Sequence, residues 1–366
     1  MSASPRPLRV VLFGDGESPH LVKWAQALAP RVELFVASSR GLAPALAALV
    51  PAERTLRLGH ATRFAGGNVA LLKTLPRLLR WLRRVDADWI SAHYLSSHGT
   101  LAWLARRLGI RARLAASAWG SDILVAPERS RLLRWATRRV LRDAALSTSD
   151  SAHMARRMHA LGAGEVMTFP FGLDALPPPP PAKEPHLFFA NRGLEDIYDP
   201  QRVLSLFASA ARAWPAARLV VANSGALREA LERRVADLGL AERVEFVGRV
   251  DAATQTGLYD RAGWYLSVPR SDSVSVSVLE AMAHGCIPLL SDLPANRELV
   301  RDADNGLIVA AGQEALDMAA LGRLAGRAAG IAAANRDWVA ANALFGPCIA
   351  RFVARLERST FPPASP

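Results

Sequence analysis

Cysteine is scarce in this sequence, because its 366 residues include only two, Cys286 and Cys348. Neither lies among residues spaced like zinc ligands, which excludes a disulfide-rich scaffold and a structural zinc site. Long apolar runs are also missing, since none is long enough to span a membrane. The apolar run that follows Met1 is too short for a signal peptide. We therefore expect a protein of a reducing compartment, the cytoplasm, and we expect no metal site.

Acidic residues are outnumbered by basic ones, but only in the first half of the chain. The whole sequence has 45 Lys and Arg against 33 Asp and Glu, a formal charge of +12. Residues 1–175 hold 25 basic and 12 acidic residues, a balance of +13, whereas residues 176–366 hold 20 and 21. We expect the first half to meet an anionic surface, either membrane phospholipid, a lipid diphosphate or nucleic acid.

The remaining composition is that of a folded protein. Apolar residues make up 51% of the chain, which allows a sizeable core and argues against disorder. Internal repeats are absent, and the length fits two domains. A nucleic-acid-binding protein is one alternative, because the sequence pI is about 10.9. The sequence has neither zinc-ligand spacing nor an aromatic RNA-binding motif, so we expect no nucleic-acid partner.

The most informative stretch predicts a strand, a polar loop, a helix and a second strand. Residues 264–268 form an apolar run short enough for a buried strand. Ser273 or Ser275 can cap the helix that follows, and Gly285 stands where that helix should end. Residues 286–290 then predict a second buried strand, parallel to the first. The loop at the end of the first strand is therefore a candidate phosphate site.

Two carboxylates flank this turn in a recognisable pattern. Asp272 is followed by seven residues and then by Glu280-Ala281-Met282-Ala283-His284-Gly285. This pattern resembles the C-terminal signature of the family-four retaining glycosyltransferases, although that family usually has Glu where this chain has Asp272. The resemblance implies the GT-B fold, an α/β architecture of two Rossmann-like domains facing across a cleft. It also implies that Asp272 contacts the transferred sugar and Glu280 the ribose hydroxyls, and a carboxylate can accept both hydrogen bonds of a diol. The alternative is an ordinary helix with a solvated glutamate.

Further donor-site residues follow from the same resemblance. The family binds the donor diphosphate with an Arg and a Lys, and Arg192 matches the Arg while Tyr198 stands near the place of the missing Lys. A guanidinium can still hold a diphosphate by two parallel hydrogen bonds. The family holds the nucleobase near the position of Gly248. The expected donor-binding residues are Asn191, Gly248, Arg249, Ser273, Val274, Ser275 and Glu280.

The first half of the chain places polar residues after three predicted strands. Gly14-Asp15-Gly16 follows the strand 8–13, His93 follows 89–92, and Gly120-Ser121-Asp122 follows 114–118. The resemblance puts His93 close to the reacting sugar and the other two loops near the acceptor and the phosphates. The alternative for Gly14-Asp15-Gly16 is a plain tight turn, and the alternative for His93 is a structural histidine. Asp86-Ala87-Asp88 precedes its strand, the wrong end for a site, and predicts only a polar turn.

The expected domains are residues 1–175 for the acceptor and 186–344 for the nucleotide sugar. A polyproline run at 177–181 makes residues 176–185 a stiff linker, and a helix at about 345–366 packs back on the first domain. Residues 71–84 predict an amphipathic helix, and Pro76 means that it either begins near Thr74 or kinks there. Its basic stripe, Lys73, Arg77, Arg80 and Arg84, is either a solvated surface or a docking site for anionic lipid.

The sequence therefore predicts a retaining, metal-independent glycosyltransferase of the hexosyltransferase type. It would move a sugar from a nucleoside-diphosphate sugar to a hydroxyl of a glycan or lipid-linked acceptor, in polysaccharide or glycolipid synthesis. We expect Asp272, Arg192 and His93 to act in the reaction, with no cofactor besides the substrate. The expected location is the cytoplasm, peripheral to the inner face of the membrane. A nucleotide-sugar isomerase of the same fold is the alternative.

Overall fold

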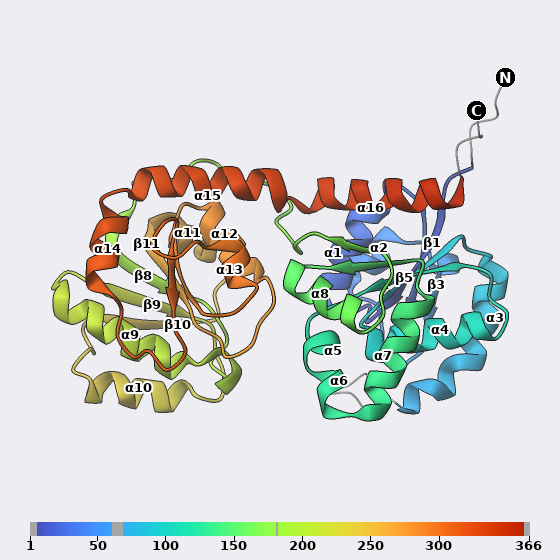
Figure 1. Ribbon diagram of the computed structural model, residues 1–366, viewed down its shortest axis with the longest axis horizontal. Helices are drawn as coiled ribbons and strands as arrows, with labels where there is room; N and C mark the ends of the chain where they lie inside the picture. Colours follow the sequence, from blue (N-terminus) through green and yellow to red (C-terminus); the bar gives the residue numbers. More distant parts are fainter. Residues whose placement is uncertain (1–5, 61–68, 181, 362–366) are drawn as a thin grey trace, which may run out of the picture. The chain divides into compact units, whose positions relative to one another are not determined.

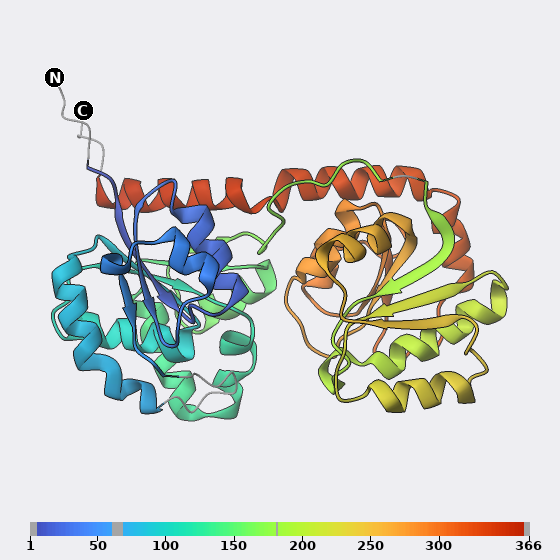
Figure 2. The same ribbon diagram turned by 180° about the vertical axis from the view of Figure 1, so that it is seen from behind.

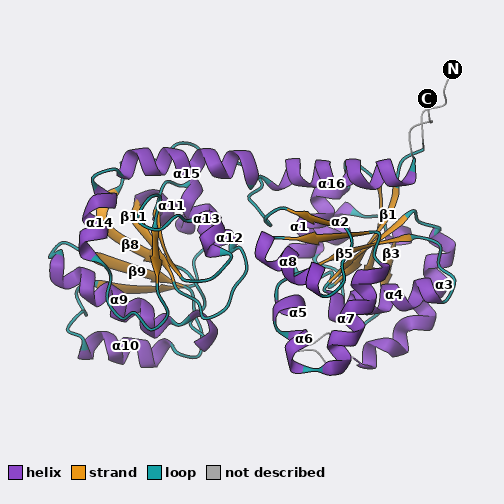
Figure 3. Ribbon diagram, in the orientation of Figure 1, coloured by secondary structure: helices purple, strands orange, loops and turns teal. Residues whose placement is uncertain are grey.

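The computed structural model describes residues 6–60, 69–180 and 182–361. The chain forms two compact units, one from residues 1–169 together with 345–366 and the other from residues 170–344. Each unit contains one sheet with helices on both sides of it (Figures 1, 2 and 3).

The first unit is built on a seven-stranded parallel sheet. Its strands are β1 (Arg9–Gly14), β2 (Glu33–Ser38), β3 (Thr55–Arg57), β4 (Trp89–His93), β5 (Arg113–Ser117), β6 (Leu146–Ser149) and β7 (Val166–Thr168). They lie in the order β3-β2-β1-β4-β5-β6-β7. Strands β2 and β3 therefore extend the sheet on one side of β1, and β4 to β7 extend it on the other side of β1. In parallel sheets such a switch point is where ligands bind.

Helices cover both faces of this sheet. They are α1 (Pro19–Leu28), α2 (Pro44–Leu49), α3 (Leu75–Val85), α4 (Thr100–Arg107), α5 (Ser121–Leu124), α6 (Ala126–Arg129), α7 (Arg131–Asp143), α8 (Ala152–Ala160) and α16 (Phe345–Thr360), with short turns η1 (Ala52–Arg54), η2 (Val69–Thr74) and η3 (Leu95–Gly99). Helices α3, α4, α7 and α8 bury their apolar residues in one cluster with one face of the sheet. Helix α1 packs instead against α2 and α16, and its Trp24 lies edge-on to Phe345 and Phe352 of α16.

Two basic segments of the first unit are each divided between two elements, and in the first of them the helix begins where the sequence predicts. The segment 71–84 is divided, because Pro76 occupies the first turn of α3, which begins at Leu75 after a 3₁₀ turn. Lys73 therefore lies before the helix that carries Arg77, Arg80 and Arg84. The second basic segment, 129–142, is likewise divided at Ser130, which lies between α6 and α7. That residue caps α7 by accepting a hydrogen bond from the amide of Leu133 (3.4 Å).

The second unit has a six-stranded parallel sheet in the order β10-β9-β8-β11-β12-β13. Its strands are β8 (Glu184–Ala190), β9 (Arg218–Ala222), β10 (Val244–Gly248), β11 (Ala262–Ser267), β12 (Ile287–Ser291) and β13 (Leu307–Val309). Its helices are η4 (Asp196–Tyr198), α9 (Pro200–Ala213), α10 (Arg228–Asp237), α11 (Ala252–Arg261), α12 (Val276–Ala283), α13 (Asn296–Leu299), α14 (Met318–Ala325) and α15 (Ala328–Asn342). Successive residues of β11 alternate between two core clusters, with Trp264 and Leu266 in one and Tyr265 in the other. The switch point of this sheet lies between β8 and β11.

The boundary between the units lies earlier than the sequence predicts. The first crossing falls between Phe169 and Pro170, so the proline-rich residues 176–185 belong to the second unit instead of linking two domains. The amide of Leu173 donates to the carbonyl of Ala343 (2.8 Å). Arg336 of α15 donates to the carbonyls of Pro177 (2.9 Å) and Pro178 (3.3 Å). Proline cannot donate a backbone hydrogen bond, but its carbonyl accepts one, and this holds the segment against α15.

Candidate functional site

The candidate donor residues gather at the switch point of the second sheet. Arg192 follows β8, and Asp272 lies on the loop that follows β11, the neighbouring strand. Parallel strands end at the same edge of a sheet, so these two distant segments meet there. Helix α12 begins directly after the same loop and carries Glu280. The predicted donor set therefore comes together around one edge.

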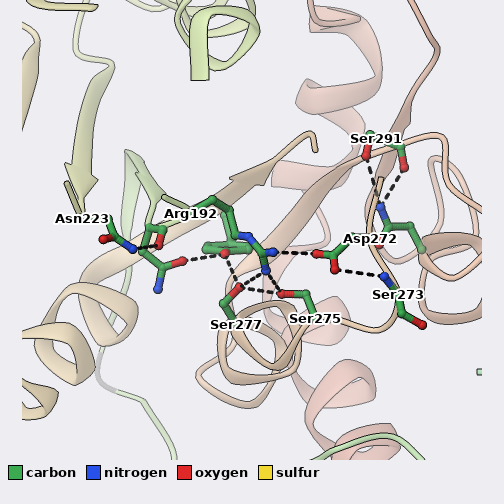
Figure 4. A network of polar contacts seen from close by, with 10 residues as sticks. Arg192, Asn223, Asp272, Ser273, Ser275, Ser277 and Ser291 are labelled. Atoms are coloured by element: carbon green, nitrogen blue, oxygen red, sulfur yellow. Dashed lines mark hydrogen bonds and ion pairs between the residues drawn. The ribbon is translucent and has the colours of Figure 1, made fainter. Parts of the chain in front are cut away.

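Arg192 is the centre of this arrangement (Figure 4). One of its guanidinium nitrogens lies 2.7 Å from a carboxylate oxygen of Asp272, and the other donates to the hydroxyls of Ser275 and Ser277. The guanidinium carbon lies 4.5 Å from the centre of the Tyr198 ring, a cation–π contact. The side chains of Arg192 and Asp272 are only 19% and 24% exposed. These contacts fix the Arg192 guanidinium in one orientation, in which it could bind an anion.

Two predicted residues of this loop have different surroundings from those expected. Ser275 occupies the cap position of α12, but its hydroxyl makes no capping hydrogen bond, because it lies against Arg192 instead. Val274 is buried and packs in the core, so only its backbone can face a ligand. Burial raises the pKa of the Asp272 carboxyl, and the Arg192 guanidinium opposes that shift. Asp272 also accepts from the amide of Ser273 (2.9 Å).

A chain of hydrogen bonds joins the Arg192 region to Glu280. The phenol of Tyr265 donates to the side-chain oxygen of Asn191 (2.6 Å), whose nitrogen donates to the phenol of Tyr259 (2.8 Å). Tyr259 in turn donates to the carboxylate of Glu280 (3.0 Å). Burial raises the pKa of Tyr265 to about 12 and that of Tyr259 well above its usual value. Both phenols stay protonated at neutral pH, so Glu280 is held as an oriented acceptor.

Gly248 and Arg249 lie at the end of β10, on the other side of β9 from this network. Gly248 has a φ of +72°, a conformation that favours glycine, and its carbonyl accepts from the amide of Asn223 (2.6 Å). The side chain of Asn223 donates to the carbonyl of Asn191 (3.2 Å). Arg249 donates to the hydroxyl of Ser224 (2.9 Å). The loops after β8, β9 and β10 are therefore tied together.

The first unit holds a pocket of about 520 Å³ beside its own switch point. Its lining includes three residues that the sequence predicts for this site, Asp15, His93 and Ser121. Gly14 and Gly16 lie too close to neighbouring segments for either residue to carry a side chain. A side chain at Gly14 would place Cβ 2.6 Å from Leu21, and one at Gly16 would place it 2.7 Å from the Gly41 carbonyl. The pocket lining also contains residues that the sequence did not indicate, His20, Arg40, Tyr94, His98 and Trp119.

His93 is a buried, neutral member of this wall. Its Nδ1 accepts from the indole of Trp119 (3.3 Å), which leaves the proton on Nε2, 3.2 Å from the Ser91 hydroxyl. Burial lowers its pKa to about 3. The ring also lies edge-on to Trp24, with centres 4.7 Å apart. His93 can therefore offer a hydrogen bond in this pocket but not a positive charge.

Asp122, the last residue of the predicted turn Gly120-Ser121-Asp122, is not among the residues that line the pocket. Its carboxylate is fully buried and accepts from the amides of Leu95 (2.7 Å) and Trp119 (2.9 Å). Burial raises its pKa to about 6. Gly120 precedes it with a φ of +96°, and the Ser121 hydroxyl lies 2.8 Å from the phenol of Tyr94. Asp122 joins the loops after β4 and β5, and Ser121 faces the pocket.

All four tyrosines of the chain lie in these two places. Tyr94 lines the pocket of the first unit, Tyr198 lies under Arg192, and Tyr259 and Tyr265 lead to Glu280. Of these four, the sequence points only to Tyr198, which stands near the place of the missing Lys. For Tyr265 a signal was available, because it stands inside the apolar run of β11 and a buried phenol needs a polar partner.

The described part of the chain has neither a metal-ligand cluster nor a membrane-spanning helix. Within residues 6–60, 69–180 and 182–361, no group of three His, Cys, Asp or Glu side chains could hold a metal ion. None of the helices in those segments is long and apolar enough to cross a bilayer.

The two parallel sheets, with candidate residues at both switch points, define a GT-B glycosyltransferase. Family models agree in both halves: residues 177–321 match "Glycosyl transferases group 1", and residues 9–151 match "Glycosyl transferase 4-like". The chain belongs to the group 1 glycosyltransferases. Its fold is similar to that of Anabaena HepE in complex with UDP (TM-score 0.74, 14% identity, 96% of this chain and 100% of that one). It is also similar to sucrose-phosphate synthase of Thermosynechococcus elongatus (TM-score 0.71, 15% identity, 96% and 99%).

Curated relatives match a shorter segment. The GDP-mannose:cellobiosyl-diphosphopolyprenol alpha-mannosyltransferase of Xanthomonas oryzae is 29% identical over 125 residues, 32% of this chain and 30% of that protein. The enzyme of the same name from Xanthomonas campestris is 30% identical over 121 residues, 32% and 30%. The match thus spans about a third of the length of these relatives.

Proposed function

We propose that this glycosyltransferase moves a hexose from a nucleoside-diphosphate sugar to a hydroxyl of a glycan or lipid-linked acceptor, with retention at the anomeric carbon. The observation that carries the proposal is the network from Arg192 to Glu280. It places one cation and one oriented carboxylate at the same edge of a sheet. The cation can bind the diphosphate, and the carboxylate can accept hydrogen bonds from the two ribose hydroxyls.

The diphosphate would take the place that Asp272 now holds. A guanidinium binds a phosphate through two parallel hydrogen bonds, and the amino end of α12 adds the positive end of a helix dipole. As the sugar–oxygen bond breaks, negative charge grows on the leaving diphosphate, and Arg192 stabilises it. Asp272, released from Arg192, would then orient the hydroxyls of the transferred sugar.

The pocket of the first unit is the proposed acceptor site. Asp15 and Ser121 offer it hydrogen-bonding groups, and His93 lies in the wall as a neutral ring. A sugar hydroxyl would reach His93 by replacing the indole of Trp119 at Nδ1. We propose His93 as the group beside the reacting centre on this basis.

The names of the relatives point to two nucleotides. HepE of Anabaena binds UDP and the Xanthomonas enzymes are named for GDP-mannose, so both nucleotides are candidates for this chain. The Xanthomonas acceptor is a sugar on diphosphopolyprenol, which fits the +13 balance of residues 1–175. We propose a lipid-linked acceptor at the cytoplasmic face of the membrane, in polysaccharide or glycolipid synthesis.

Metal independence is part of the proposal, because Arg192 and α12 can meet the charge of the leaving diphosphate. No further cofactor is proposed. Activity should therefore survive an excess of chelator. Full loss on chelation, with recovery on adding Mn²⁺ or Mg²⁺, would overturn this point.

The deciding experiment is calorimetry with UDP, GDP and ADP, followed by incubation with the sugar donor of the nucleotide that binds. We expect one nucleotide to bind, and transfer products to keep the anomeric configuration of the donor by NMR. Incubation with the donor alone tests the isomerase alternative, since an isomerase would convert the sugar without an acceptor. Absence of binding by all three nucleotides would contradict the proposed donor class.

A further inference from the structure

The outer face of α7 combines exposed apolar side chains with a dense set of arginines. Leu132 is 67% exposed and Trp135 is 49% exposed. Around them the same face carries four exposed arginines, Arg131, Arg138, Arg139 and Arg142. Exposed large apolar side chains in such a basic setting indicate a contact surface.

This face is part of a wider basic layer. Helix α4 packs against both α3 and α7, and the three helices cover the same face of the sheet. The exposed arginines of the two neighbours are Arg77, Arg80, Arg83 and Arg84 on α3 and Arg107 on α4. Among the ranges 75–85, 100–107 and 131–143, the single acidic residue is Asp143, and it accepts from the indole of Trp103 (2.7 Å).

Within the described residues, the exposed arginines of α7 are also little used by the protein itself. Arg134, on the flank of the helix, pairs with Glu128, and no ion pair of the described chain involves the four arginines named above. Only three of the 45 basic residues of the chain are lysines. Arginine is less strongly hydrated than lysine and binds phosphate with a planar fork. The outer face of α7 is therefore well matched to a flat surface that presents many phosphate groups.

We propose that the outer face of α7 docks the protein on an anionic phospholipid surface, with Leu132 and Trp135 entering the headgroup region. The inference rests on the proposed function at the membrane and assigns its docking element. That element is α7, and not the basic stripe predicted along residues 73–84. Amphipathic helices bind membranes through buried apolar area together with charge, and tryptophan favours the membrane interface. The α3 arginines contribute charge, but no large apolar side chain within Leu75–Val85 is exposed, whereas α7 exposes two.

Lipid fits this face better than nucleic acid does. Stacking on a base needs an open aromatic face, whereas Trp135 lies edge-on to Trp103 (5.9 Å between ring centres) and under the guanidinium of Arg139 (5.6 Å). Leu132, the most exposed of the large apolar side chains described, has no polar group to offer a base or a sugar. An acyl-chain interface accommodates both residues.

The test is co-sedimentation of the full chain with vesicles of phosphatidylcholine alone or mixed with phosphatidylglycerol. We expect binding that requires the anionic lipid and weakens with added salt. A variant with Arg131→Glu, Arg138→Glu and Arg139→Glu should lose about fivefold in binding for each removed arginine, and more from the added repulsion. The matched control carries Arg212→Glu, Arg218→Glu and Arg233→Glu, three exposed arginines of the second unit, with the same change in charge.

Two further variants test the apolar anchors. Leu132→Asp should reduce binding, and Leu238→Asp, at an exposed leucine of the second unit, should not. Lipids brominated on the acyl chains should quench tryptophan fluorescence, and Trp135→Phe should remove that quenching while it keeps the packing on Trp103. Calorimetry with UDP and GDP on the same variants should show unchanged nucleotide affinity, which separates a failure of docking from a failure of the proposed function.

Several outcomes would overturn the proposal. Binding to phosphatidylcholine alone at equal strength, or full binding by the α7 variants, would do so. Loss of binding only in a variant with Arg77→Glu, Arg80→Glu and Arg84→Glu would place docking on α3. Binding of duplex DNA that depends on α7, without vesicle binding, would assign this face to nucleic acid.

Discussion

Glu280 is the residue whose role can be separated most cleanly from folding. It lies on α12 and receives a hydrogen bond from Tyr259. Replacing it with Ala should remove a charge-assisted bond to ribose of about 1.5–3 kcal/mol, which is about ten- to 150-fold in nucleotide affinity. Calorimetry with the nucleotide that binds measures this loss. Glu242→Ala, at an exposed position of the second unit, is the control, and equal affinities in both variants would remove Glu280 from the donor site.

Asp272 should act on turnover more than on nucleotide binding. In the structure it pairs with Arg192 at 2.7 Å, a partner that a diphosphate would take over. Asp272→Asn should cut turnover on the order of a hundredfold, the size of one lost electrostatic contact in the transition state. Affinity for the nucleoside diphosphate should stay the same or rise, because Arg192 no longer has a competing carboxylate. A parallel fall in affinity and turnover would contradict this division between Asp272 and Glu280.

Tyr198 stands near the place where the resembled family has a lysine, and its ring supports Arg192 from one side. Tyr198→Phe should keep nucleotide affinity, because the aromatic face remains. Tyr198→Leu should lose the cation–π contact, about 0.5–2 kcal/mol, or about two- to 30-fold in affinity. The loss should be found with nucleoside diphosphate and not with the nucleoside, since only the first reaches Arg192. Equal behaviour of the Phe and Leu variants would show that the ring plays no part.

At the scale of elements, apolar runs followed by polar turns predicted most strands and both candidate edges. The turns after β1, β4, β8 and β11 were found because Gly14, His93, Arg192 and Asp272 each follow a short apolar run. Partners set by tertiary packing could not be found this way. The Ser275 hydroxyl lies against Arg192, and the Asp122 carboxylate accepts from the amides of Leu95 and Trp119 instead of lining the pocket. In both cases a contact from a distant segment overrides what the local pattern indicates.

Asp122 connects two of these loops and should matter for stability. Its two oxygens accept from the amides of Leu95 and Trp119. Asp122→Asn leaves one acceptor oxygen for two amides, so one charge-assisted bond is lost, which costs about 1.5–3 kcal/mol in the free energy of unfolding. Urea unfolding at neutral pH measures it, with Asp237→Asn at an exposed position as the control. An unchanged unfolding midpoint would mean that the loops are held by other contacts.

For the molecule as a whole, buried histidines predict a dependence of stability on pH. Burial lowers the pKa of His93 to about 3 and of His98 to about 4. These histidines take up protons in the unfolded chain below about pH 6.5 and not in the folded one, so acid favours unfolding. Asp122 acts in the opposite sense, because its folded pKa of about 6 lies above the unfolded value. Its contribution is present in acid and is lost as the pH rises through about 6.

The balance near pH 5 is two protons gained by the unfolded chain against one gained by the folded chain. The free energy of unfolding should therefore fall by about 1.4 kcal/mol for each unit of pH lowered in this range. Burial also lowers the pKa of His20, which adds to the fall. Urea titrations between pH 7 and pH 5 measure the slope. Asp122→Asn should make it steeper and His98→Gln shallower, and slopes that did not respond would assign the acid sensitivity to other groups.

The helix α16 has a consequence for the order in which the protein is made. It belongs to the first unit although it lies after the second unit in sequence. It buries Phe345, Phe352 and Leu356 in the first unit, where Trp24 meets two of them. On the ribosome, the first unit emerges with this apolar surface uncovered and stays so while the second unit is translated. The unit begun first is therefore the last to be completed, and slower translation of the second unit lengthens the time for which that surface is open to aggregation.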